Sequence, residues 1–515
     1  MSWLLNFVYL IVLATKLSSL VAATYLNADS ASAPVIGALY GGSAAHREVV
    51  LGQMAWFATL IFELATRWLP LHREIWEGAP YAMALASAAM IAWGAWRVAG
   101  RWAALIAAVL ALCAGPQTLL LLFSLNDHAS TWFSIALLGA LLILFESPPA
   151  ALGRVALVLI ALLAGVIVGI NAASDLLLLP GGVVPVLLAA GGALALRPAR
   201  PAALAAAWTA ATMVVVLVSD LVTRSVMHGA GVAASSGLAH TTLASTAALP
   251  SNFKLWWQSL MVLGDGNFFG LSLGFTSALE LACALLWVAG LAAGTRWAWR
   301  EIVQRRDADP ARLAWCIFWA SSGLLLSAAF IFSSNPIDLG SSRYLTGVLY
   351  AGAALIPLAA GGRRAARFAV TAGVSVFCFT GIVGLVEDQS IGGTGATYSL
   401  YNQVARLAAL NHLDFGYAAY WDAAPIAWAT HLRLHVYPVQ DCYPTPSPVL
   451  CWTPVHTITS WYVPRRGKHS FMIADSGTAM PTVVGANLGT PTHTYQIGSM
   501  TMYVYPYDIA SKMIP

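Results

Sequence analysis

The sequence predicts an α-helical polytopic membrane protein of about 11–13 transmembrane helices, followed by a C-terminal extracytoplasmic α/β domain. Two observations carry this prediction. Only 9% of the 515 residues are charged and 59% are hydrophobic, whereas about a quarter of the residues in a soluble globular protein are charged. Long apolar stretches follow one another as far as residue 386, and the rest of the chain is rich in Tyr, Pro and His. We therefore expect a transmembrane domain over 1–386 and a soluble domain over 387–515.

Each transmembrane helix is predicted from an apolar run of about 20 residues, the length needed to cross the hydrocarbon core. A backbone in lipid must satisfy its own hydrogen bonds, so these runs are expected to form helices. The first run lacks a charged leader and is interpreted as a retained helix rather than a cleaved signal. Interruptions at 115–117 and 171–185 predict broken or re-entrant helices and leave the count open by one. The candidate spans are 3–23, 49–68, 80–98, 102–123, 129–146, 155–171, 176–196, 202–222, 272–294, 311–333, 344–361 and 366–386.

The positions of Lys and Arg predict the side of the membrane on which each loop lies, because both residues favour cytoplasmic loops. Three strongly basic connections, at 197–200, 296–312 and 363–367, are expected in the cytoplasm. They place the 223–271 loop and the C-terminal tail on the opposite side. Basic residues near position 70 place the 24–48 loop on that side as well.

Two cysteines in the tail agree with this topology. Cys442 and Cys451 lie in the polar tail, whereas the other cysteines lie in apolar spans. A disulfide between the two fits an oxidising compartment and an extracytoplasmic tail. The alternative is a pair of free thiols.

The 24–48 loop is too long for a simple connector, and loops of this length are usually functional. It contains Asp29 a few residues after the first span, among small residues and with Pro34 downstream. A carboxylate at the membrane surface can accept the proton of an attacking hydroxyl. The alternatives are an N-cap for a helix that begins near Pro34, or a solvated loop charge.

The 223–271 loop is also too long for a connector. Its stretch 250–263 has the aromatic and apolar content of a helix lying in the membrane interface. Lys254, Trp256 and Trp257 belong to this stretch. The two indole rings are expected either to stack on a sugar face or to anchor the protein at the interface.

Two further polar motifs stand at the ends of apolar spans. Asp127 and His128 open one span, and Arg343 opens another, followed by Tyr344. A guanidinium at an interface is suited to phosphate, because its planar fork makes bidentate hydrogen bonds. The alternatives are a helix N-cap for Asp127, a cap or interface residue for His128 and an interfacial anchor for Arg343.

The order of these motifs resembles the GT-C superfamily of integral-membrane glycosyltransferases, which use lipid-linked sugar phosphates as donors. The resemblance rests on 24–42, 124–130 and 335–346, and on the external domain that follows. It implies a GT-C-like fold in a bacterial cytoplasmic (inner) membrane. It also implies an inverting hexosyl- or pentosyltransferase, which moves a sugar from a polyprenyl-phosphate-linked donor to a hydroxyl of a cell-envelope glycan or lipid acceptor at the outer face.

The resemblance also assigns roles to residues. Asp29 corresponds to the catalytic base of the family, but Ser30 stands where many members carry a second acidic residue. Asp127 is the expected second carboxylate, with His128 in support. We expect no cofactor, and a divalent metal is not supported because one carboxylate makes a poor site. The implied partners are the donor, the acceptor and membrane lipids, and no nucleic acid. The expected phosphate contacts are Arg343, Lys254 and Arg224, and the expected sugar or acceptor contacts are Tyr344, Trp256 and Trp257.

The tail is predicted to be a small α/β domain, long enough to bury its own core. The pattern of residues 420–431 indicates a helix, and 434–439, 469–474 and 495–505 indicate strands. Tyr420, Trp421 and Asp422 are expected either to contact sugar or to pack within the domain.

Two other classes of function are compatible with a membrane protein of this composition. A lipid or glycan transporter or flippase should carry ionisable residues at mid-membrane. In this sequence the central positions of the spans are nearly all apolar, and Glu63 and Glu280 are the chief exceptions. A membrane ligase or acyltransferase of the cell envelope usually presents a His-rich loop, and His228 and His240 leave that alternative open.

Overall fold

The chain folds into two compact units, each described here by itself. The first comprises Met1–Leu17, Glu77–Ser225 and Thr241–Asp388, and the second comprises Ser18–Trp76, Val226–His240 and Gln389–Pro515. The computed structural model describes residues 2–40, 49–51, 73–123, 128–196, 198, 200–229, 233–234, 241–303, 309–387, 394–442, 449–453 and 456–514.

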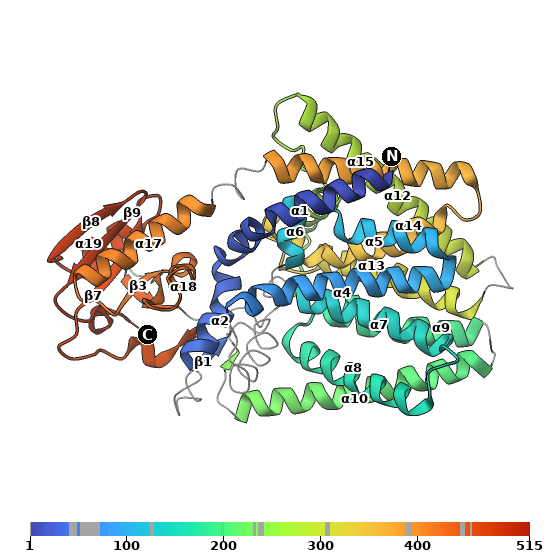
Figure 1. Cartoon of the computed structure of the whole chain (residues 1–515). Helices are drawn as coiled ribbons and strands as arrows, with labels where there is room; N and C mark the ends of the chain where they lie inside the picture. Colours follow the sequence, from blue (N-terminus) through green and yellow to red (C-terminus); the bar gives the residue numbers. More distant parts are fainter. Residues whose placement is uncertain are drawn as a thin grey trace. The chain divides into compact units, whose positions relative to one another are not determined.

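The first unit is helical (Figure 1), as the long apolar runs predict. Among the described residues, eight helices are long and apolar enough to cross a membrane, or nine if a bent pair forms one span. The helices that contribute to this unit are α1 (Ser2–Tyr25), α4 (Arg73–Ala99), α5 (Arg101–Leu112), α6 (Pro116–Phe123), α7 (Ser130–Glu146), α8 (Arg154–Ser174), η3 (Leu179–Val183), α9 (Val184–Leu196), α10 (Arg200–Gly229), α11 (Leu249–Leu263), α12 (Phe275–Val303), α13 (Pro310–Phe332), η4 (Leu339–Leu345), α14 (Thr346–Ala359) and α15 (Arg364–Glu387).

Two details differ from the predicted set of spans, and a third agrees with it. Helices α7 and α14 have 17 and 14 residues and are shorter than a full crossing. The predicted span 49–68 begins instead with a strand, β1 (Val49–Leu51), and its remaining residues lie outside the described part of the chain. The predicted interruption near Pro116 is confirmed, because α5 and α6 meet there at 91°. Proline supplies no backbone N–H, so the helix ends and restarts at this point.

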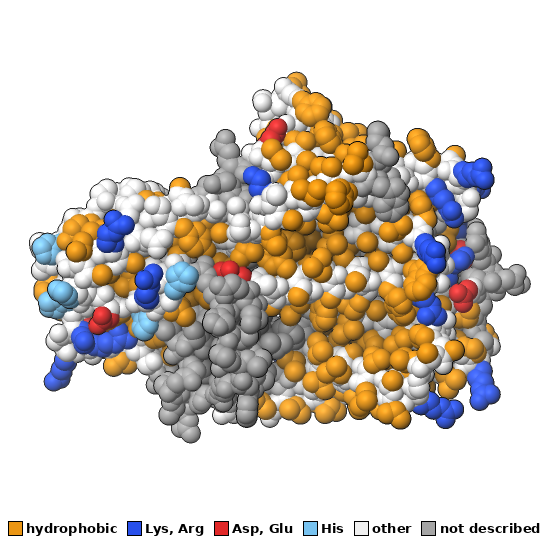
Figure 2. Space-filling view, viewed as in Figure 1, with side chains coloured by type: hydrophobic (Ala, Val, Ile, Leu, Met, Phe, Trp, Pro, Cys, Tyr) orange, Lys and Arg blue, Asp and Glu red, His pale blue; other side chains and the backbone are white. Residues whose placement is uncertain are grey.

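The outward face of the first unit is apolar. Figure 2 shows hydrophobic side chains covering most of the helix surfaces visible in that view. Leu163 of α8, Val214 and Leu217 of α10, and Leu285 of α12 are between 58% and 64% exposed. A contiguous apolar surface of this kind is stable only when lipid covers it. The structure therefore confirms the prediction of a multi-pass helical membrane protein.

One end of this bundle is held by arginines. Arg97 at the end of α4 donates a hydrogen bond of 2.7 Å to the carbonyl of Ser147, just beyond α7. Arg312 near the start of α13 donates one of 3.0 Å to the carbonyl of Val98. Arg367 at the start of α15 lies over the ring of Trp102, 5.4 Å from its centroid. Two of the three basic connections thus meet at the same end of the bundle.

The second unit contains a six-stranded sheet of order β5-β4-β3-β7-β9-β8. Strands β4, β3 and β7 are parallel, whereas β5 pairs antiparallel with β4, β9 with β7, and β8 with β9. The elements are α2 (Ala28–Tyr40), α17 (Thr394–Leu410), β3 (Phe415–Ala419), α18 (Tyr420–Ala429), β4 (His435–Cys442), β5 (Val449–Trp452), β6 (Thr457–Ile458), η5 (Thr459–Tyr462), β7 (Ser470–Asp475), α19 (Met480–Asn487), β8 (His493–Ile497), β9 (Met500–Tyr505) and η6 (Ile509–Lys512).

The α/β character of the tail is confirmed, with one correction. The predicted strand 495–505 is a hairpin of β8 and β9, which pair antiparallel. The chain reverses at Gly498, whose φ of 60° lies in the left-handed region that glycine adopts readily. A small second sheet pairs β1 with β2 (Ala233–Ala234) and with β6.

The predicted loop 24–48 is also corrected, because residues 28–40 form α2. This helix packs against α18 within the second unit. At the far edge of the large sheet a disulfide joins Cys442 and Cys451 of neighbouring strands β4 and β5, with their Cα atoms 5.9 Å apart.

Candidate active site

The second unit holds Asp29 in the first turn of α2, a few residues after α1 ends at Tyr25. The side chain of Asn27 accepts a hydrogen bond of 2.8 Å from the backbone N–H of Asp29 and caps the new helix. The N-terminal end of a helix carries a partial positive charge, which favours a carboxylate at this position. Asp29 is therefore half-buried at the N-terminal end of α2, where the helix favours a negative charge.

A side chain from the C-terminal region completes the surroundings of Asp29. The hydroxyl of Tyr420 donates a hydrogen bond to Oδ1 of Asp29. Tyr420 is the first residue of α18 and directly follows β3, so the sheet and α18 together fix its position. Nearby, Tyr25 stacks on Trp428 of α18 at 4.9 Å between ring centroids, which fastens the end of α1 to the same helix.

His456 lies beside this pair. Its ring stacks on Tyr420, with 6.3 Å between centroids, and its backbone has a φ of 51°. Burial lowers the pKa of His456, and the negative charge of Asp29 acts in the opposite direction. Among the described residues, its Nδ1 has no hydrogen-bond partner. The sequence analysis missed His456, which is isolated in the chain and gives no local signal.

A second polar cluster lies in the first unit around His128. Nδ1 of His128 is 2.5 Å from Oδ2 of Asp175, which follows the last residue of α8. The hydroxyl of Thr131 donates to the same oxygen, and the backbone N–H of Leu177 donates to Oδ1 at 3.0 Å. Burial opposes ionisation of Asp175, but these three donors hold the pKa of its carboxyl below the usual range.

Tyr344 of η4 contacts His128, and Arg343 in turn contacts Tyr344. The ring of Tyr344 meets the imidazole of His128 edge-on, with 5.3 Å between centroids. The guanidinium of Arg343 lies 5.2 Å from the centroid of the Tyr344 ring and donates a hydrogen bond of 3.3 Å to its hydroxyl. The structure thus brings together three of the residues that the sequence analysis singled out.

The other predicted site residues lie elsewhere in the first unit. Arg224 pairs with Asp220 one turn earlier in α10, at 3.0 Å. Lys254 is exposed on α11, which packs against η4. Asp127 lies outside the described residues. Among the described residues, no group of three or more His, Cys, Asp or Glu side chains is arranged to hold a metal ion.

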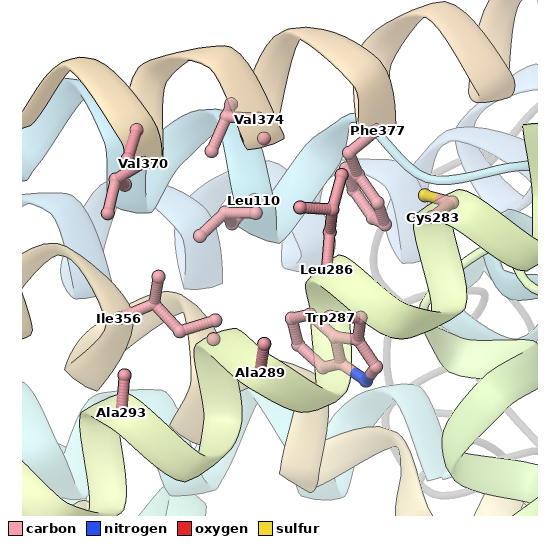
Figure 3. Close-up of a pocket in the computed structure, with 13 residues that line it drawn as sticks. Leu110, Cys283, Leu286, Trp287, Ala289, Ala293, Ile356, Val370, Val374 and Phe377 are labelled. Atoms are coloured by element: carbon pink, nitrogen blue, oxygen red, sulfur yellow. The ribbon is translucent and has the colours of Figure 1, made fainter. Parts of the chain in front are cut away.

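Two apolar cavities lie between the helices of the first unit. One, of about 250 Å³, is bounded by α5, α12, α14 and α15 (Figure 3), and Trp287 and Phe377 are among its lining residues. The other, of about 730 Å³, is lined by Trp256 and Trp257 of α11 and by residues of α12, α13 and α14. Both are suited to hydrocarbon rather than to a polar ligand.

Comparison with known proteins identifies the fold. No protein-family model and no curated protein matches the sequence. Two solved structures match over nearly the whole chain, both of ArnT from Cupriavidus metallidurans. One is bound to undecaprenyl phosphate, with 13% identity over 98% of this chain and 99% of that chain. The other is in the apo state, with 12% identity over 98% of each chain, and the TM-score is 0.55 for each.

The chain has the fold of ArnT. The resemblance predicted from the order of the motifs is confirmed at the level of the fold. The structure adds residues that were not assigned to a site from the sequence. Asp175 lies in a predicted interruption between apolar spans, and a buried carboxylate at such a break is the signal that identifies it.

Proposed function

We propose that the protein is a glycosyltransferase that moves a sugar from a polyprenyl-phosphate-linked donor to a hydroxyl of a cell-envelope glycan or lipid. The observation that carries this proposal is the likeness over 98% of the chain to ArnT, whose structure contains undecaprenyl phosphate. The proposed location is the outer face of a bacterial inner membrane, with the C-terminal region extracytoplasmic. The sugar is a hexose or a pentose.

Asp29 is the proposed general base. The acceptor oxygen attacks C1 of the sugar while Asp29 accepts the hydroxyl proton. The bond between C1 and the phosphate oxygen breaks, and its electron pair leaves with the phosphate. A single displacement of this kind inverts the configuration at C1. The hydrogen bond from Tyr420 supports this role, because it fixes the orientation of the carboxylate.

Arg343 is the proposed ligand of the donor phosphate. Negative charge grows on the phosphate as the sugar leaves, and a fixed cation stabilises that charge in the transition state. Contact with Tyr344 supports this role, because it limits the orientations that the guanidinium can adopt. Lys254 and Arg224 are further candidates for the phosphate, and Tyr344, Trp256 and Trp257 are candidates for the sugar or acceptor.

The proposal is tested by transfer of label. Full-length protein in lipid nanodiscs is given radiolabelled undecaprenyl-phosphate hexoses and pentoses together with an envelope extract as acceptor. We expect label in the acceptor fraction with at least one donor. Arg343→Lys keeps the charge but loses the bidentate fork, and should lower the rate by about 10-fold or more. The control is Arg406→Lys on the exposed face of α17. Absence of transfer from every donor would contradict the proposal.

A further inference from the structure

The pairing of His128 with Asp175 fixes which ring nitrogen is available to a ligand. An ionised carboxylate only accepts hydrogen bonds, so Nδ1 of His128 carries the hydrogen that Asp175 receives at 2.5 Å. Asp175 is itself held by the Thr131 hydroxyl and the Leu177 N–H. The imidazole is therefore fixed in orientation, and Nε2 is the nitrogen that is left to react.

Nε2 of His128 is buried and, among the described residues, has no hydrogen-bond partner. The whole side chain is only 3% exposed. Buried polar atoms in folded proteins are nearly always paired, so an exception requires an explanation, such as a catalytic role or a bound ligand. The backbone at His128 has a φ of 74°, and a non-glycine residue in that region is typical of functional sites.

The surroundings of the ring select an anion. The charged and titratable groups near it in the described chain include Asp175, Tyr344 and, beyond Tyr344, Arg343. Arg224 donates a hydrogen bond of 3.3 Å to the carbonyl of Ala172 in the last turn of α8, three residues before Asp175. Asp175 is already occupied by its donors, and the other groups in this region are guanidinium groups, a phenol and Nε2. These groups hydrogen-bond well to phosphate oxygens.

A purely structural role does not explain the pair. Asn171 of α8 already bonds to Ser130, Thr131 and Ser134 of α7, at distances from 3.0 to 3.3 Å. That network joins the two helices without His128. A histidine that served only as a further link would not need a buried nitrogen without a partner.

We propose that His128, oriented by Asp175, is the acid that protonates the departing phosphate in the transfer reaction, an inference that rests on the proposed function. As the bond between C1 and the phosphate oxygen breaks, that phosphate takes the electron pair, and the Nε2 proton of the imidazolium passes to one of its oxygens. The acceptor proton passes separately to Asp29. Both side chains return to their starting states by proton exchange with water.

The test compares the pH dependence of the transfer rate for wild type, His128→Gln, Asp175→Asn and Ser134→Ala. Wild-type activity should fall at alkaline pH, as the imidazolium loses its proton. His128→Gln should lose about 100-fold or more in kcat, the range that general acids contribute. Its activity should also no longer fall at alkaline pH, so that the alkaline limb of the pH profile is lost. Asp175→Asn removes the charge that stabilises the imidazolium, so its alkaline limb should move to lower pH. Ser134→Ala breaks the Asn171 network only and should keep the wild-type profile.

A binding measurement separates this inference from the proposed function. Stabilisation of each variant by undecaprenyl phosphate is measured at pH 6.5 and pH 8.5. The affinity of His128→Gln should be at least 10-fold lower than that of wild type at pH 6.5 and close to it at pH 8.5. Equal binding of wild type and His128→Gln at pH 6.5 overturns the inference whether or not transfer is detected.

In the kinetic test, a His128→Gln profile that loses the acid limb instead of the alkaline limb, or that is unchanged, overturns the inference as well. Absence of transfer with the predicted difference in binding overturns only the proposed function.

Discussion

Tyr420, the first residue of α18, donates a hydrogen bond to Asp29 in the first turn of α2, across 391 positions of the chain. The bond connects the predicted base to the sheet of the C-terminal region, because Tyr420 directly follows β3. The C-terminal region therefore contributes directly to the surroundings of Asp29 within the second unit.

Replacing Tyr420 by Phe should slow transfer. The change removes one hydrogen bond to a charged acceptor, which contributes about 1.5–3 kcal/mol, so we expect kcat to fall by at least about 10-fold. KM for the donor should stay close to that of wild type, because the phenol orients the base and does not bind the sugar phosphate. Steady-state kinetics measure both constants. Tyr503→Phe on β9 is the matched control, and equal loss in both variants would show a general effect on the fold.

Asp422 predicts a pH dependence of stability in the second unit. Burial, and to a lesser extent the charge of Asp475, raise the pKa of Asp422 to about 6. Because the folded state holds this proton more tightly than the unfolded chain, its contribution to stability falls as pH rises from about 4 to about 6. Asp422→Asn should remove that penalty and raise the free energy of unfolding at pH 7 by about 3 kcal/mol.

Thermal unfolding of the variants at pH 4.5 and pH 7 measures this effect. The gain from Asp422→Asn should be fully present at pH 7 and reduced to about a third at pH 4.5, where the folded state keeps the proton that the unfolded chain has largely lost. Asp414→Asn is the control, because the carboxyl of Asp414 is 85% exposed. A gain of the same size at both pH values would contradict the assignment to ionisation.

The disulfide between Cys442 and Cys451 should stabilise the edge of the sheet. It closes a short loop with a sequence separation of 9, for which the chain-entropy estimate is about 2–3 kcal/mol. The double substitution Cys442→Ser and Cys451→Ser should therefore lower the melting temperature of the protein. The buried Cys316→Ala variant controls for loss of a thiol. Labelling of intact cells with a thiol reagent before and after reduction would show whether the bond forms outside the cytoplasm, and thiols that react without reductant would contradict that location.

The long apolar helices, α18, β4 and β7 could be predicted from local patterns, because apolar runs and alternation are properties of neighbouring residues. Helices α17 and α19 and strands β3 and β5 were not predicted. Helix α2 was foreseen only as an alternative, a helix beginning near Pro34, because its Ala- and Ser-rich sequence has no pronounced apolar stripe and its packing partner, α18, lies far along the chain. The hairpin was missed although Gly498 and Ser499 form a two-residue loop between Ile497 and Met500, across which the apolar alternation changes phase.

In the candidate site, the functional residues could be chosen from the sequence, but their contacts could not. Asp29, His128 and Arg343 could be chosen by their chemistry and their positions at the ends of apolar runs. Their partners could not, because contacts such as that between His128 and Asp175, 47 positions apart, form only on folding. Sequence position alone also gave no means to separate Arg343, which contacts Tyr344, from Arg224, which pairs with Asp220.

The most direct measurement of the central claim is the transfer rate of Asp29→Asn with the donor that wild type uses. Asn keeps the shape of the side chain and can still accept the hydrogen bond from Tyr420, but it cannot take up the acceptor proton. The variant should melt within a few degrees of wild type, and its kcat should fall by about 100-fold or more. A folded Asp29→Asn protein that transfers sugar at the wild-type rate would contradict the account.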